Sequence, residues 1–289
     1  MIEIRVMSER DVALGLRLCR AAEWNQLEAD WRRLLALQPD GCFVAEWKSK
    51  AVGTATTTVY GRTCAWIGMV LVDLAHRRRG IGTALLEHCI AYLQARGVRA
   101  IKLDATEAGR AVYAKVGFVD EYATFRYVAS PPTPGAKPLI AGVRRLHDAD
   151  WPAIARLDAE AFGADRSALL RRLAADNRDY AQVAVEYGDD VKGFAMAYPG
   201  HDALHVGPVV AVGTEEAQAL VGTLIGVDAL RGDARQAVLD VLGPNAASVD
   251  VAATWGFTRQ RRLMRMVLGE NASPGRTELV FAGSGFETG

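Results

Sequence analysis

A basic, glycine-rich turn at residues 77–83 is the part of this chain best suited to hold an anion. It reads Arg77-Arg78-Arg79-Gly80-Ile81-Gly82-Thr83. At the start of a helix, several backbone N–H groups have no intrahelical partner, and the helix dipole favours negative charge. Glycines let the backbone approach a ligand closely, and arginine side chains donate charge-assisted hydrogen bonds. The turn therefore predicts a binding site for a pyrophosphate.

The runs on either side of the turn place it between a strand and a helix. Residues 66–72 are apolar enough for a buried strand, and residues 84–93 carry apolar side chains at helical spacing. The turn lacks the Gly-Lys-Ser/Thr ending of a P-loop and the third glycine of a dinucleotide fingerprint. Taken alone, it is equally compatible with a solvated loop, so its interpretation depends on a second element.

That second element follows at residues 100–118. Residues 100–105 predict another strand, and residues 107–116 predict a short helix that Gly117 ends. Here the chain resembles the GNAT superfamily of acetyl-CoA-dependent N-acetyltransferases. The resemblance rests on Arg77-x-x-Gly80-x-Gly82, on the strand before it, and on Ala111-x-Tyr113-x-x-x-Gly117-Phe118, in this order. It covers about residues 1–128.

The resemblance implies acetyl-CoA as the co-substrate. The backbone of the strand before the basic turn, at residues 66–72, would pair with the pantetheine amides, and an N–H group of that strand would polarise the thioester carbonyl. The turn would hold the pyrophosphate, although a solvated basic turn is the alternative for its arginines. The expected cofactor-binding residues are Val70, Leu71, Val72, Arg77, Arg78, Arg79, Gly80, Ile81, Gly82, Thr83 and Asp104.

Tyr113 matches the family's tyrosine by its spacing to Gly117, and the resemblance implies that it is the general acid. A phenol near the sulfur can protonate the departing thiolate; a tyrosine that only packs the helix is the alternative. Glu46 is the expected general base, with Glu23 and Asp73 as further candidates, and each can also be a plain surface carboxylate. The motif has no cysteine near Tyr113, so direct attack in a ternary complex is expected.

Three aromatic residues, Trp24, Trp31 and Tyr60, fall in segments that line the acceptor cleft in GNAT folds. They are expected to bind the acceptor, with a place in the core as the alternative. The predicted acceptor is the primary amine of a small molecule, since a second domain can enclose the cleft. Two other functions stay open: a protein lysine or N-terminal acetyltransferase, and an acyl-CoA-binding sensor without turnover.

The second half of the chain repeats the plan of the first. Residues 4–11 align with 143–150, residues 67–72 with 206–211, and residues 116–118 with 255–257. Between the halves, four prolines at 130–138 predict an extended linker. The expected fold is α/β: two tandem GNAT-like domains, each a twisted, mixed, mainly antiparallel sheet flanked by helices. We expect a catalytic domain at 1–129 and a degenerate domain at 139–289.

The degenerate half lacks the residues that would hold the cofactor. In place of the basic turn it has Gly213 followed by Glu215 and Glu216, whose carboxylates would repel a pyrophosphate at a helix start. Ala252 stands at the position that matches Tyr113. We therefore expect no acetyl-CoA in the second half.

Composition limits the remaining functions. The 289 residues carry 34 basic and 34 acidic side chains, a balance that argues against a dedicated nucleic-acid binder. No apolar run reaches membrane-spanning length, and the first residues are charged rather than typical of a signal peptide. The four cysteines match no zinc pattern and favour buried free thiols, so no metal is expected. Since no apolar run is long enough to span a membrane, no membrane partner is expected either. A cytoplasmic location and a possible homodimer complete the expectations.

Overall fold

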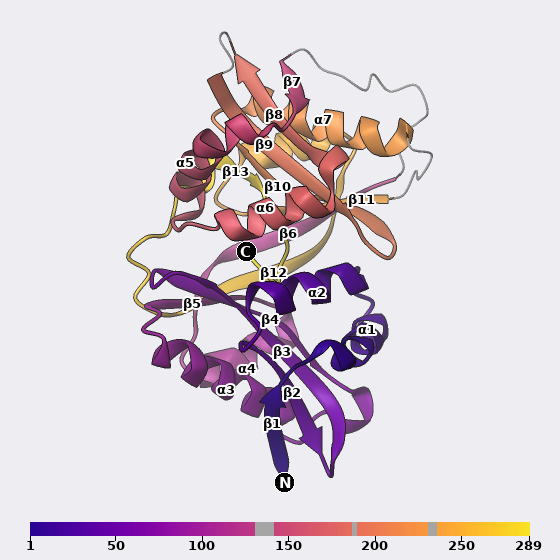
Figure 1. The fold of residues 1–289 in the computed structure, drawn as a ribbon, viewed down its shortest axis with the longest axis vertical. Coiled ribbons are helices and arrows are strands. Elements are labelled where there is room, and N and C mark those ends of the chain that lie inside the picture. Colours follow the sequence, from indigo (N-terminus) through magenta and orange to yellow (C-terminus); the bar gives the residue numbers. More distant parts are fainter. Residues whose placement is uncertain (131–141, 187–189, 231–235) are drawn as a thin grey trace. The chain divides into compact units, whose positions relative to one another are not determined.

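The computed structural model describes residues 1–130, 142–186, 190–230 and 236–289 (Figure 1). The predicted linker at 130–138 lies outside the described residues except for Ser130. Contacts between residues divide the chain into two compact units. Unit 1 consists of Met1–Glu121, Arg265–Ala272 and Phe286–Gly289, and unit 2 of Tyr122–Met264 and Ser273–Gly285.

Unit 1 is built on a mixed sheet. Its strands, in spatial order, are β1 (Ile2–Val6), β2 (Cys42–Trp47), β3 (Lys50–Tyr60), β4 (Cys64–Val72), β5 (Ala100–Ala105) and the end of β12 (Thr258–Gly269). The pairs from β1 to β4 are antiparallel, and β4 and β5 are parallel. The parallel β4–β5 pair needs a long crossover, and the segment that contains the basic turn supplies it.

Helices cover both faces of this sheet. They are α1 (Val12–Ala21), α2 (Glu28–Leu37), α3 (Ile81–Ala95) and α4 (Glu107–Lys115). Leu18 of α1 and Trp31 of α2 pack with Leu71 of β4 in one buried cluster. On β3, Gly53 faces Leu85 of α3, and successive strand residues point to opposite faces, so α3 covers the other side.

Unit 2 repeats this plan. Its strands, in order, are the start of β12, β6 (Val119–Ala129, from Tyr122), β11 (Gln236–Leu242), β10 (Ala203–Ala211), β9 (Asp190–Pro199), β8 (Ala181–Glu186) and β7 (Val143–Arg145), with β13 (Val280–Ala282) paired to β10. Its helices are α5 (Trp151–Phe162), α6 (Ser167–Asp176), α7 (Thr214–Leu230) and α8 (Ala247–Thr254). Short 3-10 turns occur at Glu9–Asp11, Leu74–His76, Asp148–Asp150, Arg178–Tyr180 and Thr277–Leu279.

The same ion pair begins both halves of the chain and makes the repeat visible in atomic detail. Arg5 donates two hydrogen bonds of 2.8 Å to Asp11, and Arg144 donates bonds of 2.8 and 2.9 Å to Asp150. Each aspartate also accepts from the backbone N–H group three residues earlier, at 2.9 and 2.7 Å. The predicted fold class, α/β with two similar parts built on mixed sheets flanked by helices, is confirmed.

The two units exchange segments relative to the order of the chain. In unit 2, β6 from the first half pairs with β11, and buried Arg126 donates bonds of 2.7 and 2.6 Å to Asp240. In unit 1, Arg265 from the second half binds Asp104 of β5. The expected division into 1–129 and 139–289 followed chain order, because an apolar run identifies a strand but not its partner.

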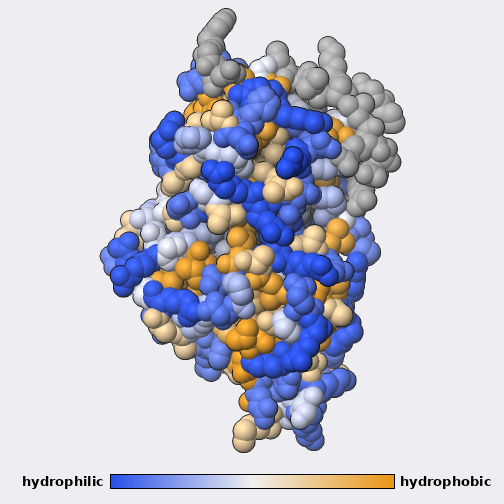
Figure 2. All heavy atoms as spheres, viewed as in Figure 1, coloured by the Kyte–Doolittle hydropathy of each residue, from blue (hydrophilic) through white to orange (hydrophobic). Residues whose placement is uncertain are grey.

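The surface and the cysteines fit a globular protein. Hydrophilic residues cover much of the face seen in Figure 2, with apolar residues gathered in patches between them. Cys19, Cys42, Cys64 and Cys89 are buried free thiols, as predicted. Within the described residues, none of the helices has the length and apolar character needed to span a membrane.

Candidate active site

A pocket of about 630 Å³ opens in unit 1 beside the carboxyl ends of β4 and β5. Parallel pairing of these strands ends at Trp66 and Lys102, after three residue pairs. Beyond that point the pocket is surrounded by four parts of unit 1: the ends of β4 and β5, the turn before α3, the loop after α1, and helix α4. Its lining residues are Ala21, Ala22, Glu23, Trp24, Val70, Leu71, Val72, His76, Arg77, Arg78, Gly80, Ile81, Gly82, Thr83, Thr106, Ala108, Gly109, Val112 and Tyr113.

A β-bulge at Met69 marks the point where β4 changes course. The register of β3 against β4 shifts between Thr54 and Thr56, and Met69 has a φ of 50°. The Thr54 hydroxyl donates a 2.9 Å hydrogen bond to the Met69 carbonyl and holds the bulge from the buried side. Bulges bend a strand and often lie beside active sites. Here the bulge directly precedes the residues of β4 that line the pocket.

The basic turn lines the pocket from the start of α3. Gly80 is the N-cap of α3 with a φ of 79°, a conformation that glycine adopts without strain. The first turn of α3 contains no acidic residue, so its N–H groups and dipole present uncompensated positive charge. Arg77 and Arg78 line the pocket, whereas Arg79 lies over the Trp47 ring at 5.8 Å and is not part of the lining.

Tyr113 lines the pocket from α4. Its ring packs on Gly109, where an added Cβ would lie only 3.0 Å from the ring. Burial raises the pKa of the Tyr113 phenol to about 12, so the phenol keeps its proton at neutral pH. The helix is fixed at its start by Thr106, whose hydroxyl accepts a 3.2 Å hydrogen bond from the Gly109 N–H group. A neutral phenol in this place is equipped to donate a proton.

The loop after α1 brings a carboxylate to the pocket. Glu23 has a φ of 57° at the helix C-terminus, where glycine is the usual residue. The Glu23 N–H group donates to the Arg20 carbonyl at 3.1 Å, and the Trp24 N–H group donates to the Cys19 carbonyl at 2.9 Å. Among the described residues that line the pocket, Glu23 is the only acidic one.

An ion pair ties α1 to the segment that follows β4. Arg17 donates a 2.7 Å hydrogen bond to Asp73, and this contact lowers the pKa of the Asp73 carboxyl to about 2. Asp73 also caps the turn at Leu74–His76 by accepting from the Ala75 N–H group at 3.0 Å. Asp73, one of the base candidates from the sequence, therefore has a structural partner and does not line the pocket.

Several residues expected at the site lie elsewhere. Glu46 accepts a 2.7 Å hydrogen bond from Arg5 on the neighbouring strand, and Trp31 is fully buried against Gly15 of α1. Neither belongs to the lining of the pocket. The structure thus gives both a structural environment, because a carboxylate beside Arg5 and an indole in the core are stabilised by those neighbours.

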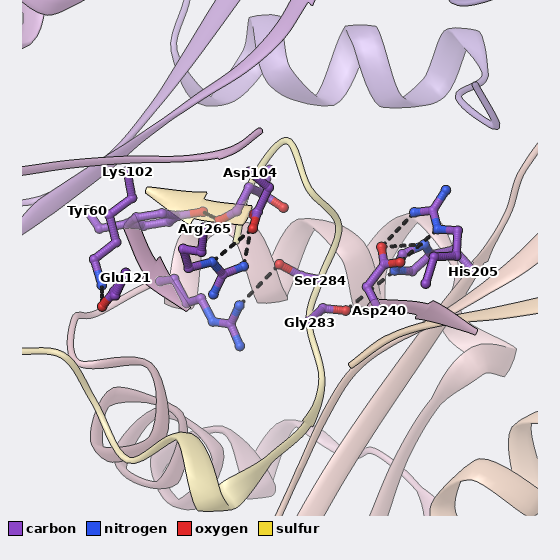
Figure 3. Close-up of polar contacts among 12 residues, drawn as sticks. Tyr60, Lys102, Asp104, Glu121, His205, Asp240, Arg265, Gly283 and Ser284 are labelled. Atoms are coloured by element: carbon purple, nitrogen blue, oxygen red, sulfur yellow. Dashed lines mark hydrogen bonds and ion pairs between the residues drawn. The ribbon is translucent and has the colours of Figure 1, made fainter. Parts of the chain in front are cut away.

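Asp104 and Tyr60 are also engaged by other parts of unit 1. Arg265 donates bonds of 3.1 and 2.9 Å to Asp104, whose side chain is fully buried (Figure 3). The Tyr60 hydroxyl donates a 2.6 Å bond to the Thr288 carbonyl. Asp104 therefore holds an arginine instead of lining the pocket, and Tyr60 contacts the segment Phe286–Gly289.

The α4 side of the pocket contains residues that the sequence analysis did not select. Thr106, Ala108, Gly109 and Val112 all line the pocket. A threonine directly before a predicted helix is a cap signal, and a glycine inside a short helix is unusual, so Thr106 and Gly109 carried usable signals. Ala108 and Val112 carried none, because small apolar residues on a helix are most often packing residues.

In unit 2 the corresponding gap between strands is filled by the chain itself. Parallel pairing of β10 with β11 ends at His205 and Val238 after three residue pairs, as it does between β4 and β5. Beyond that point β13 pairs with Val209 and Val210. The Asn245 side chain holds β13 through bonds of 3.0 and 2.9 Å to the carbonyls of Glu278 and Val280.

Comparison with known proteins agrees with this architecture. Residues 13–118 match the model described as "Acetyltransferase (GNAT) family", and residues 154–282 match the one described as "Acetyltransferase (GNAT) domain". The uncharacterized N-acetyltransferase YitH of Bacillus subtilis (strain 168) is 27% identical over 222 residues, which are 77% of each chain.

Solved structures show the same fold over the whole chain. A Pyrococcus horikoshii protein assigned to the acetyltransferases has a TM-score of 0.82 and 25% identity, covering 100% of this chain and 96% of its own. A tandem GNAT protein from the clavulanic acid biosynthesis pathway has a TM-score of 0.66 and 18% identity, covering 93% and 98%. The chain belongs to the GNAT family of N-acetyltransferases and carries two GNAT domains in tandem.

Proposed function

We propose that the pocket of unit 1 binds acetyl-CoA and that the protein transfers the acetyl group to a primary amine. The GNAT family generally uses this cofactor, and the order of the pocket's parts suits it. The N–H groups of the first turn of α3 receive the pyrophosphate, and the backbone of Val70–Val72 receives the pantetheine. The thioester then lies at the β4 bulge, on the side of the pocket that Tyr113 lines.

The reaction we propose is direct attack of the amine nitrogen on the thioester carbonyl. A C–N bond forms, and a backbone N–H group of β4 stabilises the oxyanion of the tetrahedral intermediate. The C–S bond then breaks, the thiolate of CoA takes the proton of the Tyr113 phenol, and the phenolate regains a proton from the positively charged nitrogen of the intermediate. The Tyr113 phenol carries its proton at neutral pH, so the donor is protonated before each turnover.

We propose Glu23 as the group that takes a proton from the ammonium of the acceptor, directly or through one water molecule, so that the neutral amine attacks. Glu23 is the acidic residue of the described pocket lining, and it holds a backbone conformation that costs a non-glycine residue about 1 kcal/mol. Strained residues of this kind cluster at active sites. Glu46 is not carried forward as the base, since Arg5 engages it away from the pocket.

The half of the chain at 139–289 is proposed to bind no cofactor. Strand β13 occupies the gap that acetyl-CoA would need between β10 and β11. At the start of α7, Glu215 and Glu216 bring negative charge where unit 1 has arginines. The acceptor is proposed to be a small molecule; a protein amine as acceptor would leave the cofactor chemistry unchanged.

Tyr113→Phe tests the proposed general acid. We expect acceptor-dependent release of CoA thiol to slow by about 10²–10⁴-fold, while acetyl-CoA affinity measured by calorimetry is retained. Tyr92→Phe is the matched control, because Tyr92 lies on α3 outside the pocket lining and bonds Asp40. Wild-type turnover in Tyr113→Phe would contradict the assignment. Absence of acetyl-CoA binding in the wild-type protein would refute the proposed cofactor site.

Glu23→Gln and Glu23→Gly test the proposed base. Both remove the carboxylate and are expected to lower the acetylation rate below that of the wild type. Glu23→Gly should also raise the free energy of unfolding by about 1 kcal/mol, because glycine adopts this φ without strain. Lys48→Gly is the control: its φ of 52° gives the same relief in the β2–β3 turn, outside the pocket lining. Equal rates in Glu23→Gln and the wild type would exclude this base.

A further inference from the structure

The segment Phe286–Gly289 packs directly on β4 of unit 1. A Cβ added to Gly68 would lie 2.7 Å from the Cα atom of Glu287, so there is no room for a side chain between β4 and the segment. Thr288 is fixed by the Tyr60 hydroxyl, whose bond to the Thr288 carbonyl is 2.6 Å long. Glu287 and Thr288 are 7% and 5% exposed, so both residues are buried.

This contact lies on the face of the sheet to which Leu71 of the pocket lining also points. Gly68 and Leu71 pair with Thr56 and Thr54 of β3, and residues two apart on a strand point to the same face. Leu71 lines the pocket, and the lining of β4 begins at Val70, two residues after Gly68. The parting of β4 from β5 begins just after Trp66.

The loop after α1 connects the same two places. Trp24 lines the pocket, and two residues later Gln26 donates a 3.2 Å hydrogen bond to the Glu287 carboxylate. At the far side of the segment, Gly289 packs on Trp66, where a Cβ would lie 2.8 Å from the ring. The segment is therefore held from β3, from β4 and from the loop, and it contacts β4 two residues before the pocket lining begins at Val70.

Its position bears on the acceptor, an argument that rests on the proposed function. The pyrophosphate end of the pocket is at the basic turn, so the acetyl end is at Val70. An amine that attacks the acetyl group must approach from beyond Val70, where the segment stands. An extended peptide would need the face of β4 at Trp66–Gly68 to lie along, and residues 286–289 already occupy it.

We propose that Phe286–Gly289 is an acceptor-selectivity element, which fills the ground that a peptide acceptor would occupy and so restricts the enzyme to small primary amines. The position of this segment then determines the class of acceptor. An amine is accepted if it can reach Val70 without lying along the part of β4 that residues 286–289 cover.

Two variants remove this segment from β4 in different ways. Gly68→Ala places a methyl group against the backbone of Glu287, and its three nearest contacts are all with that residue. A deletion of residues 286–289 removes the segment outright. Gly213→Ala of unit 2 is the matched control, because its Cβ meets only the end of the Glu216 side chain. Circular dichroism and thermal unfolding show which variants are folded.

The readout is the ratio of kcat/KM for a lysine-containing peptide to that for a small alkylamine, with acetyl-CoA in both assays. We expect the wild type and Gly213→Ala to favour the alkylamine strongly. Gly68→Ala or the deletion should raise the ratio at least tenfold, without change in acetyl-CoA affinity. A wild type that acetylates peptides as well as amines, or folded variants with an unchanged ratio, would overturn the proposal.

Binding of a fluorescently labelled lysine peptide gives a second readout that does not need turnover. Anisotropy titrations should show tighter peptide binding in Gly68→Ala or the deletion than in the wild type. Equal binding in all folded proteins would overturn the proposal. Failure of the proposed function has a different signature: no acetyl-CoA binding and no thiol release with any amine, in the wild type as well as in the variants.

Discussion

Breaking the ion pair between Asp104 and Arg265 should destabilise unit 1 by several kcal/mol. The Asp104 side chain is 0% exposed and the Arg265 side chain 5%, and two hydrogen bonds of 3.1 and 2.9 Å join them. Arg265 also lies 4.5 Å from the centroid of the Trp66 ring. Removing one partner leaves the other as an uncompensated buried charge, which costs about 3–5 kcal/mol. Asp104→Asn and Arg265→Met are the two single changes.

The double variant separates the pair from its parts. When both charges are gone, no unpaired ion stays buried, so the double variant should lose at least about 1–2 kcal/mol less than the sum of the single losses. Urea unfolding followed by tryptophan fluorescence measures all four proteins, and a loss of 3 kcal/mol lowers a midpoint by at least about 1 M. Arg172→Met is the exposed control, in a pair with Asp176 that contributes about 0.5 kcal/mol or less. Single losses below 1 kcal/mol, or additive ones, would refute this reasoning.

Three further outcomes are expected. Gly109→Ala should lower kcat more than acetyl-CoA affinity, since its Cβ would lie 3.0 Å from the Tyr113 ring and displace the phenol; an unchanged kcat would contradict this. Arg5 lowers the pKa of Asp11 from 3.8 to about 2, so this contribution to stability is present above pH 4 and lost as the pH falls towards 2. Asp11→Asn should therefore cost about 2 kcal/mol in urea unfolding at pH 7 and less than about 0.5 kcal/mol at pH 2, whereas a constant difference would argue against this pair. Calorimetry should find one acetyl-CoA per chain, and two would show that β13 leaves its gap.

The sequence predicted the strand, the turn and the tyrosine that line the pocket, because these parts are close together in the chain. The strand, the basic turn and the start of α3 are contiguous, and Tyr113 follows within one supersecondary unit, so spacing alone carries the geometry. The internal repeat could also be predicted from the sequence, because Arg5 and Arg144 lie at matching positions of the two halves. Local pattern also gave the buried free cysteines.

The other expected residues depended on partners far away in the chain. Arg265 lies 161 residues from Asp104, and Thr288 lies 228 residues from Tyr60. No spacing rule reveals that such residues meet, because the meeting is fixed by strand exchange and not by local propensity. Trp31 went to the core for a related reason: an amphipathic helix shows which face is apolar, but not what that face covers.

The exchange of segments also has a consequence for synthesis on the ribosome. Unit 1 contains Met1–Glu121 together with Arg265–Ala272 and Phe286–Gly289. At a translation rate of about 5–20 residues per second, roughly 10–30 s pass between the emergence of its first part and of its last. For most of that interval β5 has no β12 beside it, and Asp104 has no Arg265 to pair with. The unpaired edge of β5 is then exposed to other nascent chains. Unit 1 is therefore begun first but completed only after most of unit 2 has been made. A fragment that ends at residue 129 corresponds to this incomplete unit 1, without β12 and without residues 286–289.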